Sequence, residues 1–260
     1  MDYIVVKAFT LRNLSLTFKT IDRSLNLFYW PLLNIIVWGM TSVWVQQASN
    51  LNNFLATFLT VLIFWQITLR SGIDIAKNLL DEIITKNLIN IFITPIDEDE
   101  WILSVILSSV ISSTILIAFS GLMAWLIYSI NIFHIGVWFL PFILVLMVSG
   151  WALGLFLCGL TIWLGRRGTD LIFTLGWLIA PFSAVYAPLN ILPKIVQKVA
   201  IYLPMTYVFE NIRFLLKSQS IVYSYLIFSI LGSIFYFFIS LLFFKFMFKR
   251  AKMKGLASLE

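Results

Sequence analysis

Six apolar runs, each about as long as a bilayer is thick, restrict this chain to a helical membrane protein. A helix rises about 1.5 Å per residue, so it needs roughly 20 apolar residues to cross about 30 Å of hydrocarbon. Hydrophobic residues make up 61% of the chain and charged residues only 12%, which excludes an ordinary soluble domain. We therefore predict an all-α polytopic membrane protein with six transmembrane helices. The predicted spans are residues 27–46, 53–72, 101–128, 137–164, 170–187 and 221–244.

The positions of lysine and arginine predict how these spans are oriented. Basic residues in short loops beside a span resist translocation, so they accumulate on the cytoplasmic side. If both termini are cytoplasmic, all but four of the 18 lysines and arginines lie inside. The first 23 residues also lack the compact apolar core of a cleaved signal peptide. We therefore expect a multi-pass protein of the cytoplasmic (inner) membrane with both termini in the cytoplasm.

Two basic segments flank the predicted spans. Residues 3–25 mix apolar and basic side chains at helical spacing, which favours an amphipathic helix in the membrane interface over a disordered leader. The chain also ends in a lysine-rich stretch that follows the sixth span. The resulting segments are the interfacial helix (1–26), spans one and two (27–72), spans three to five (101–187), span six (221–244) and a basic cytoplasmic tail (245–260).

The longest predicted cytoplasmic connection, residues 73–100, is typical of a surface helix with one apolar face. Ile75, Leu79 and Ile83 recur at spacings of four, and charged residues fill the positions between them. Such a face needs a partner. The connection ends in the acidic run 97–100, whose D-x-x-E pattern predicts a capping box at the start of span three. Adjacent carboxylates at a helix start point in different directions, so we favour capping over a metal site and assign no metal.

Prolines at positions 181, 188, 193 and 204 break the apolar segment before the last span into short pieces. Proline in a helix interior removes a backbone hydrogen bond and clashes with the preceding turn. We therefore predict that residues 188–220 form short re-entrant helices on the outer side. Irregular backbone at membrane depth is tolerated only where protein or a water-filled cavity shields it, so this segment indicates a transport route.

Two stripes of polar and aromatic residues on spans one and two are candidates for a substrate path. A mixed stripe that faces the bundle interior suits an amphiphile that enters from the lipid. Each serine or threonine taken singly is better explained by a hydrogen bond back to its own helix. The candidates are Asn34, Trp38 and Thr41 on span one, and Thr57, Thr60, Phe64 and Thr68 on span two.

Several other features predict packing or exclude a class of chemistry. Gly150 and Gly154 form a G-x-x-x-G motif, which permits close helix contact within one subunit or between two. The single cysteine, Cys158, cannot form an internal disulfide, and the single histidine, His134, lies in an outer turn. These residues supply no nucleophile with a base, which argues against an intramembrane enzyme. The basic residues follow membrane orientation, so nucleic acid is not an expected partner.

Three segments of the chain, taken in order, match the pattern of a known family. They are Leu27–Gly39 (LFYWPLLNIIVWG), Asp81–Trp101 (DEIITKNLINIFITPIDEDEW) and Ser183–Arg213, which begins SAVYAPLNILP. In this order they resemble the permease subunit of ATP-binding-cassette (ABC) exporters of the ABC-2 type, over nearly the whole chain. Ala184 departs from the pattern, because many members have glycine at this turn, and this leaves the local turn geometry open.

The resemblance implies a half-transporter that pairs, in membrane lipid, with a second permease copy or a paralogue and with two copies of a separate ABC ATPase subunit. The chain has no G-x-x-x-x-G-K-[ST] loop, so ATP and Mg are expected on that partner and no cofactor on this chain. The helix around residues 79–88 would couple the ATPase to the spans. The residues expected to dock are Asp81, Glu82, Lys86 and Asn87; the alternative is that they solvate an interfacial helix.

The proline-broken segment is a candidate outer gate. Glu210 and Arg213 lie one helical turn apart and are expected to form an ion pair, which we favour as a local structural contact over a gating role. The candidate gate residues are Pro188, Pro193, Pro204, Glu210 and Arg213.

We therefore expect a transport subunit, not an enzyme, that exports a lipophilic or amphiphilic compound (drug-like or lipid) while a partner hydrolyses ATP. The alternative within the family is export of a lipid-linked polysaccharide or other glycoconjugate. A more remote alternative is an ion-coupled secondary transporter, which usually carries carboxylates in mid-span. The sequence argues against it because the acidic residues nearest the spans lie at span ends or in connections. They are Asp74, Asp81, Asp170 and Glu210.

Overall fold

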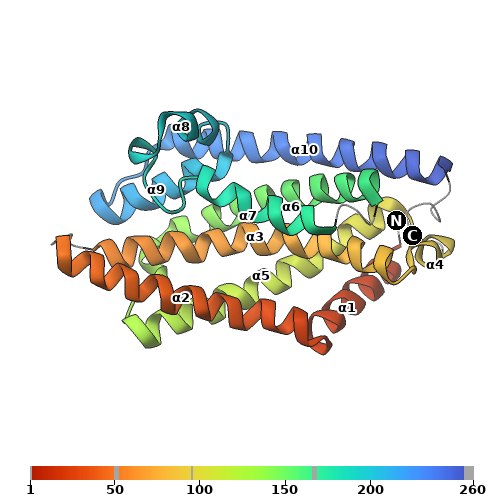
Figure 1. Cartoon of the computed structure of the whole chain (residues 1–260), viewed down its shortest axis with the longest axis horizontal. Coiled ribbons are helices and arrows are strands. Elements are labelled where there is room, and N and C mark those ends of the chain that lie inside the picture. Colours follow the sequence, from red (N-terminus) through yellow and green to blue (C-terminus); the bar gives the residue numbers. More distant parts are fainter. Residues whose placement is uncertain (1, 50–52, 95, 166–168, 255–260) are drawn as a thin grey trace.

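The computed structural model describes residues 2–49, 53–94, 96–165 and 169–254, and all regular structure in these ranges is helical (Figure 1). The predicted all-α class is therefore confirmed for the described part of the chain. In chain order the helices are α1 (Tyr3–Lys19), α2 (Ile21–Ser49), α3 (Phe54–Ile84), α4 (Leu88–Ile93), α5 (Glu98–Tyr128), the 3₁₀ helix η1 (Ile132–Trp138), α6 (Phe139–Leu164), α7 (Thr169–Phe182), the 3₁₀ helix η3 (Leu189–Ile191), α8 (Lys194–Ala200), α9 (Pro204–Ser218) and α10 (Tyr223–Lys254).

Five helical stretches in the described ranges are long and apolar enough to cross a membrane, which makes this a multi-pass membrane protein by composition and length. They are Ile21–Ser49, Phe54–Ile84, Glu98–Tyr128, Ile132–Leu164 and Tyr223–Met253. The predicted span at residues 170–187 is not among them. Helix α7 has only 14 residues, and it would rise about 21 Å, too little for about 30 Å of hydrocarbon. A total of six is reached only if α8 and α9, bent by 103° at their junction, count as one broken span.

Two helices continue well beyond their predicted spans. The second span was expected to end at residue 72, with a separate surface helix after it, but α3 runs without a break for 31 residues to Ile84. The predicted tail likewise begins as helix, because α10 extends to Lys254, and residues 255–260 lie outside the described residues. The helices therefore end later than the predicted spans, and their additional turns pack in the core at the charged end, with the apolar residues from Ile75 to Ile83 of α3 and Phe248 and Ala251 of α10 buried there.

Helix α1 packs on α5 with its small and polar side, opposite to the arrangement of a soluble amphipathic helix. Its buried residues are Val6, Thr10, Asn13 and Thr17, while Tyr3, Ile4, Leu11 and Phe18 are exposed. The chain turns at Thr20, whose side chain and backbone N–H both bond the carbonyl of Leu16. The predicted interfacial segment 1–26 thus ends about six residues too late, because α2 already begins at Ile21.

The contact between α3 and α6 sets the centre of the bundle, and glycine makes it possible. A Cβ built on Gly72 would lie 2.8 Å from the Gly150 carbonyl oxygen, and one on Gly154 would lie 2.6 Å from the Gly72 carbonyl oxygen. The two backbones therefore touch, as small residues allow in membrane helices. Of the two roles predicted for Gly150 and Gly154, the structure shows packing within the subunit.

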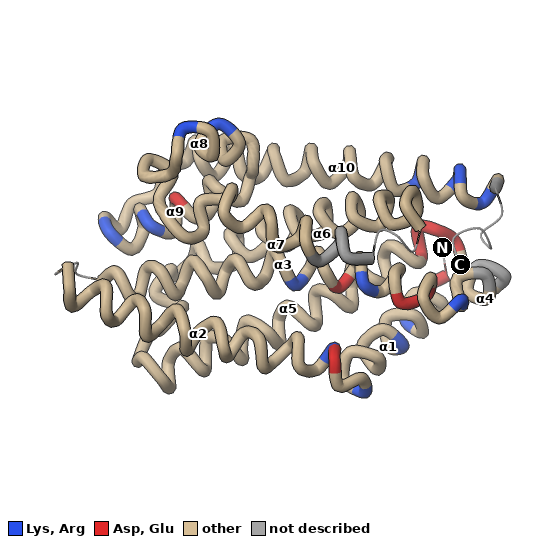
Figure 2. The backbone as a smooth tube through the Cα atoms, viewed as in Figure 1, with Lys and Arg blue, Asp and Glu red and all other residues tan. Residues whose placement is uncertain are grey.

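Many charged residues lie at one end of the bundle, where both ends of the described chain lie, and a smaller group lies on α8 and α9 at the other end (Figure 2). We call the first of these the charged end: the amino end of α1, the last turns of α3 and α10, α4 and the first turn of α5. The capping box predicted at residues 97–100 is confirmed there. Glu100 accepts hydrogen bonds from the backbone N–H groups of Asp97 (3.1 Å) and Asp2 (2.5 Å). Lys245 and Lys252 of α10 pair with Asp99 and Glu98.

The glycine contact between α3 and α6 predicts a position-specific cost for one added methyl group. Gly154→Ala forces its Cβ against the α3 backbone, so we expect about 1–3 kcal/mol of destabilisation from overpacking. Gly176→Ala on α7 is the matched control, because its nearest neighbour is 3.6 Å away. In a helix, that substitution is neutral or stabilising by up to about 1 kcal/mol. Thermal unfolding of the detergent-solubilised protein measures both; equal shifts would contradict the close contact.

Candidate functional site

A cavity of about 480 Å³ lies between α2, α3, α5 and α7, and it is the candidate binding site. This volume is in the range of about 300–1,000 Å³ that is usual for ligand pockets. Most of the wall is apolar and aromatic, with a few polar side chains. The lining residues are Asn26, Trp30, Pro31, Asn34, Trp38, Leu62, Trp65, Gln66, Leu69, Arg70, Ile73, Leu116, Trp177 and Tyr186.

One face of α3 supplies the polar part of this wall. The lining residues Leu62, Trp65, Gln66, Leu69, Arg70 and Ile73 follow one another at spacings of one, three and four, which places them on a single helix face. Arg70 is only 7% exposed, and its Nε lies 2.9 Å from Asp74 Oδ2, one turn further along the helix. A buried, ion-paired arginine therefore lies in an otherwise aromatic pocket.

Two of the predicted substrate-path residues, Asn34 and Trp38, do line this cavity. The Asn34 side-chain amide donates to the Trp30 carbonyl, and the Trp38 ring lies 5.5 Å from that of Tyr186. Thr41, the third residue of that stripe, is exposed and bonds back to the Val37 carbonyl. Two of the three predicted residues on α2 therefore lie at the cavity, and the third does not.

The predicted α3 stripe lies elsewhere. Thr60 bonds back to its own helix, Phe64 is fully buried against the Phe139 ring, and the Thr68 carbonyl faces Gly150 of α6. Thr57 is half-buried and is not part of the wall either. Phe64 and Thr68 contact α6, while the next face of α3 lines the cavity. The sequence signal for that face was the pairs Trp65–Gln66 and Leu69–Arg70, which lie four residues apart.

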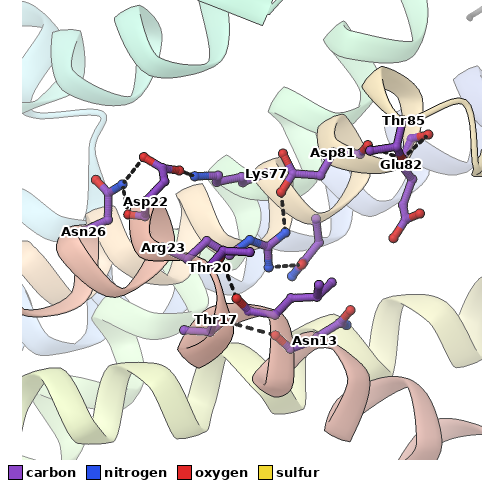
Figure 3. A network of polar contacts seen from close by, with 12 residues as sticks. Asn13, Thr17, Thr20, Asp22, Arg23, Asn26, Lys77, Asp81, Glu82 and Thr85 are labelled. Carbon is purple, nitrogen blue, oxygen red and sulfur yellow. Dashed lines mark hydrogen bonds and ion pairs between the residues drawn. The ribbon is translucent and has the colours of Figure 1, made fainter.

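Ion pairs join α1 and α2 to the charged-end half of α3 (Figure 3). Arg23 bonds Asp81 at 2.5 Å and Asn78 at 2.8 Å, and Lys77 pairs with Asp22. Together with the Arg12–Glu82 pair (2.6 Å), these contacts hold the α1–α2 turn against α3. We call them the ion-pair ladder: Arg12–Glu82, Asp22–Lys77 and Arg23–Asp81.

The four residues predicted to dock an ATPase are mostly engaged within this chain. Asp81 and Glu82 belong to the ion-pair ladder, and Asn87 donates to Glu82 at 2.7 Å. Lys86 is exposed, with φ at +54°. The apolar face beside them is also covered, since Ile75, Leu79 and Ile83 are fully buried in the chain's own core. The expectation that this face is open to a partner is therefore wrong, because α5 and α6 pack on this part of the chain's core.

The proline-broken segment folds as short helices, as predicted. Pro188, Pro193 and Pro204 each stand at the start of a helix, where a missing N–H costs nothing. The predicted pair of Glu210 and Arg213 is confirmed at 2.8 Å. Pro181 differs, since it lies inside α7.

Glu210 and Arg213 do more than pair with each other. Arg213 Nη2 donates to the carbonyls of Ala184 (2.6 Å) and Val185 (2.8 Å), and Glu210 Oε1 accepts from the Leu189 N–H at 3.0 Å. The pair therefore clamps the chain between α7 and η3 onto α9. Ala184 lies in this clamp with φ at +57°, a conformation that favours glycine, so the turn keeps the geometry expected of a glycine despite the departure in sequence.

The clamp predicts that Arg213 is needed for stability and that a basic residue one turn further on is not. Arg213→Gln breaks two carbonyl contacts and leaves the Glu210 carboxylate without its cation. We expect about 2–3 kcal/mol of destabilisation. Lys217→Gln on the same helix is the control, because Lys217 is exposed. Thermal unfolding and protease cleavage between residues 183 and 191 report the effect. If the clamp does not hold this loop, Arg213→Gln and Lys217→Gln will have the same thermal stability and the same rate of cleavage.

No protein-family model matches this sequence, and no curated protein matches it. The structural features that bear on function are therefore the cavity, the ion-pair ladder and the clamp.

Proposed function

We propose that this chain is the permease subunit of an ABC exporter of the ABC-2 type, which moves a lipophilic or amphiphilic substrate out of the cytoplasmic membrane. The observation that carries the proposal is the aromatic cavity between α2, α3, α5 and α7, which combines indole and apolar walls with a few hydrogen-bonding groups. Such a lining suits a compound with a large apolar body and a polar head.

In this proposal, ATP is hydrolysed by a separate ATPase that contacts the charged end on the cytoplasmic side. Helix α3 is continuous from the cavity to that end, so Arg70 and Ile84 belong to one rigid rod. The ion-pair ladder ties the same part of α3 to the α1–α2 turn. A push on the end of α3 would therefore reach the cavity wall formed by α2. Among the predicted docking residues, Lys86 is the one whose exposure supports direct contact with a partner.

A second permease copy or a paralogue would complete the transporter. Helices α2 and α10 bury only 22% and 17% of their apolar windows within the chain, which leaves both with large surfaces for lipid or for another subunit. The clamp of Glu210 and Arg213 would hold the opposite end of the bundle together as the outer gate.

Trp30 and Trp44 provide a matched test of the cavity, because both lie on α2 and both are largely exposed, at 52% and 69%. Only Trp30 lines the cavity. We expect Trp30→Ala to lower ATP-dependent uptake of fluorescent amphiphiles into inverted vesicles from the native cells by roughly three- to tenfold, the effect of losing about 1 kcal/mol of aromatic contact. Trp44→Ala should leave uptake unchanged. Uptake that persists with vanadate, or without ATP, would refute the ABC assignment.

A specific observation also supports a second candidate, the ion-coupled secondary transporter. Asp74, expected in a connection, lies instead on the spanning helix α3, with 13% of its side chain exposed and Arg70 as its partner. Ionisable groups inside a span are frequently part of an ion or proton route.

Asp74→Asn separates the two candidates. If transport is coupled to protons, this substitution abolishes uptake that is driven by a proton gradient, and an uncoupler stops uptake by the wild-type protein. If the ABC proposal holds, uptake by the wild-type protein continues with the uncoupler. The Asp74→Asn variant then keeps its ATP requirement, with a reduced amount of folded protein as the main effect. The measurement is initial uptake rate with ATP alone and with an imposed proton gradient alone.

A further inference from the structure

We propose that the cavity recognises an amphiphile by an anionic headgroup, and that Arg70 is the residue that binds it. This inference rests on the proposed function, because it names the substrate class of the same cavity. It goes beyond that function in assigning the charge of the ligand and its contact residue.

The first observation is an unused hydrogen-bond donor. Arg70 has 7% of its surface exposed and its Nε lies 2.9 Å from Asp74 Oδ2, yet neither Nε nor Nη2 donates a hydrogen bond to a described residue. A buried donor without an acceptor costs free energy, and a charged donor costs more. Arg70 also lines the cavity. An acceptor that enters the cavity can therefore satisfy a group that the described part of the protein leaves without a partner.

The neighbouring polar groups on α3 also favour an acceptor. Trp65 Nε1, which can only donate, is buried and has no partner among the described residues. Gln66 already uses its oxygen to accept from Ser120 at 3.3 Å, so its amide NH₂ is the group that remains. The described lining residues include no aspartate or glutamate. On the α3 wall the free polar groups are donors, which suits an acceptor-rich headgroup such as a sulfonate, phosphate or carboxylate. Asn26 and Asn34 on the α2 wall use their amide NH₂ groups within the helix and keep their side-chain oxygens as acceptors.

Asp74 positions Arg70 without cancelling its charge completely. The carboxylate contacts Nε, which leaves the other side of the guanidinium fork available. The anionic group of the ligand would neutralise the part of the Arg70 charge that Asp74 leaves uncompensated.

The place of Arg70 along α3 fits a molecule that keeps its usual orientation in one leaflet. Arg70 is 16 residues after Phe54, the first residue of α3, which is about 24 Å along a helix. It therefore lies toward the charged end of a hydrocarbon layer of about 30 Å. A headgroup at Arg70 would leave the tail near Leu62 and Trp38, which line the cavity further from the charged end.

The test uses the purified full chain in phosphatidylcholine nanodiscs, without any ATPase, and tryptophan quenching by brominated single-chain probes. The probes are an alkyl sulfonate, which stays anionic at all relevant pH values, and an alcohol of the same chain length. We expect the sulfonate to bind the wild-type protein at least tenfold more tightly than the alcohol. Arg70→Gln should weaken sulfonate binding roughly ten- to a hundredfold and leave alcohol binding within about threefold.

Arg23→Gln is the matched control, because Arg23 is equally buried (7%) and ion-paired but does not line the cavity. It should not change the preference for the sulfonate. Loss of Trp30 quenching in Trp30→Phe shows that the signal arises in the cavity. If Arg70→Gln fails to fold, the double variant Arg70→Gln/Asp74→Asn keeps a neutral pair of nearly the same shape, and it should likewise lose the preference.

Brominated phosphatidylglycerol tells which source the headgroup comes from. If this lipid quenches as strongly as the sulfonate and the two compete with each other, the headgroup belongs to a membrane lipid. If only the sulfonate quenches, the headgroup belongs to a free amphiphile. The inference is overturned if the wild-type protein prefers neither probe, if Arg70→Gln weakens both probes equally, or if Arg23→Gln has the same effect as Arg70→Gln. None of these results depends on ATP. Anion preference combined with ATP-independent transport would end the proposed function and leave the binding site in place.

Discussion

The backbone contact between α3 and α6 at Gly72, Gly150 and Gly154 is the constraint on which the rest of the bundle depends. Lipid provides no hydrophobic drive between helices, so close packing has to hold them, and only glycine lets two backbones come this near. With α6 on one side and α5 on another, α3 is covered along most of its length. Because it is covered in this way, α3 forms the centre of the bundle. Its residues contribute both to the cavity wall and to the ion-pair ladder.

Burial of α3 also explains why its charged residues are paired. A charge inside a membrane protein is tolerated when a partner and hydrogen bonds replace water. Arg23, Lys77 and Asp81 meet this condition through the ion-pair ladder. Asp74 and Arg70 form an ion pair, but Asp74 Oδ2 and Arg70 Nε and Nη2 make no hydrogen bond to a described residue. A buried polar group that the protein leaves without a hydrogen bond is a good candidate for a ligand-binding group, because a ligand can supply the missing bond.

Much of the fold could be predicted because lipid imposes a simple rule on length and polarity. The spans corresponding to α2, α5 and α6, the capping box at Glu100 and the proline-started short helices all follow from local sequence. Hydropathy alone could not reject the fifth predicted span. Helix α7 ends at Phe182 because the chain turns there, and hydropathy does not describe that turn. The surface helix at Ile75 was mistaken because an apolar face has the same pattern whether a partner protein or the chain's own α6 covers it. The cavity face of α3 was missed because threonine, which bonds to its own helix, gives a more visible stripe than Trp65 and Arg70.

The double role of Glu100 has a mechanical consequence. One carboxylate holds the first turn of α5 and the start of α1 together, and Thr10 adds a contact from α1 to the Ser104 carbonyl at 3.4 Å. These two helices are thus fastened as one body. Between α1 and α2 stands the single residue Thr20, in an extended conformation with ψ at 127°. The ion-pair ladder fastens this joint to α3 as well, so a hinge movement of α2 about Thr20 relative to α5 has to break Arg23–Asp81 and Asp22–Lys77 first.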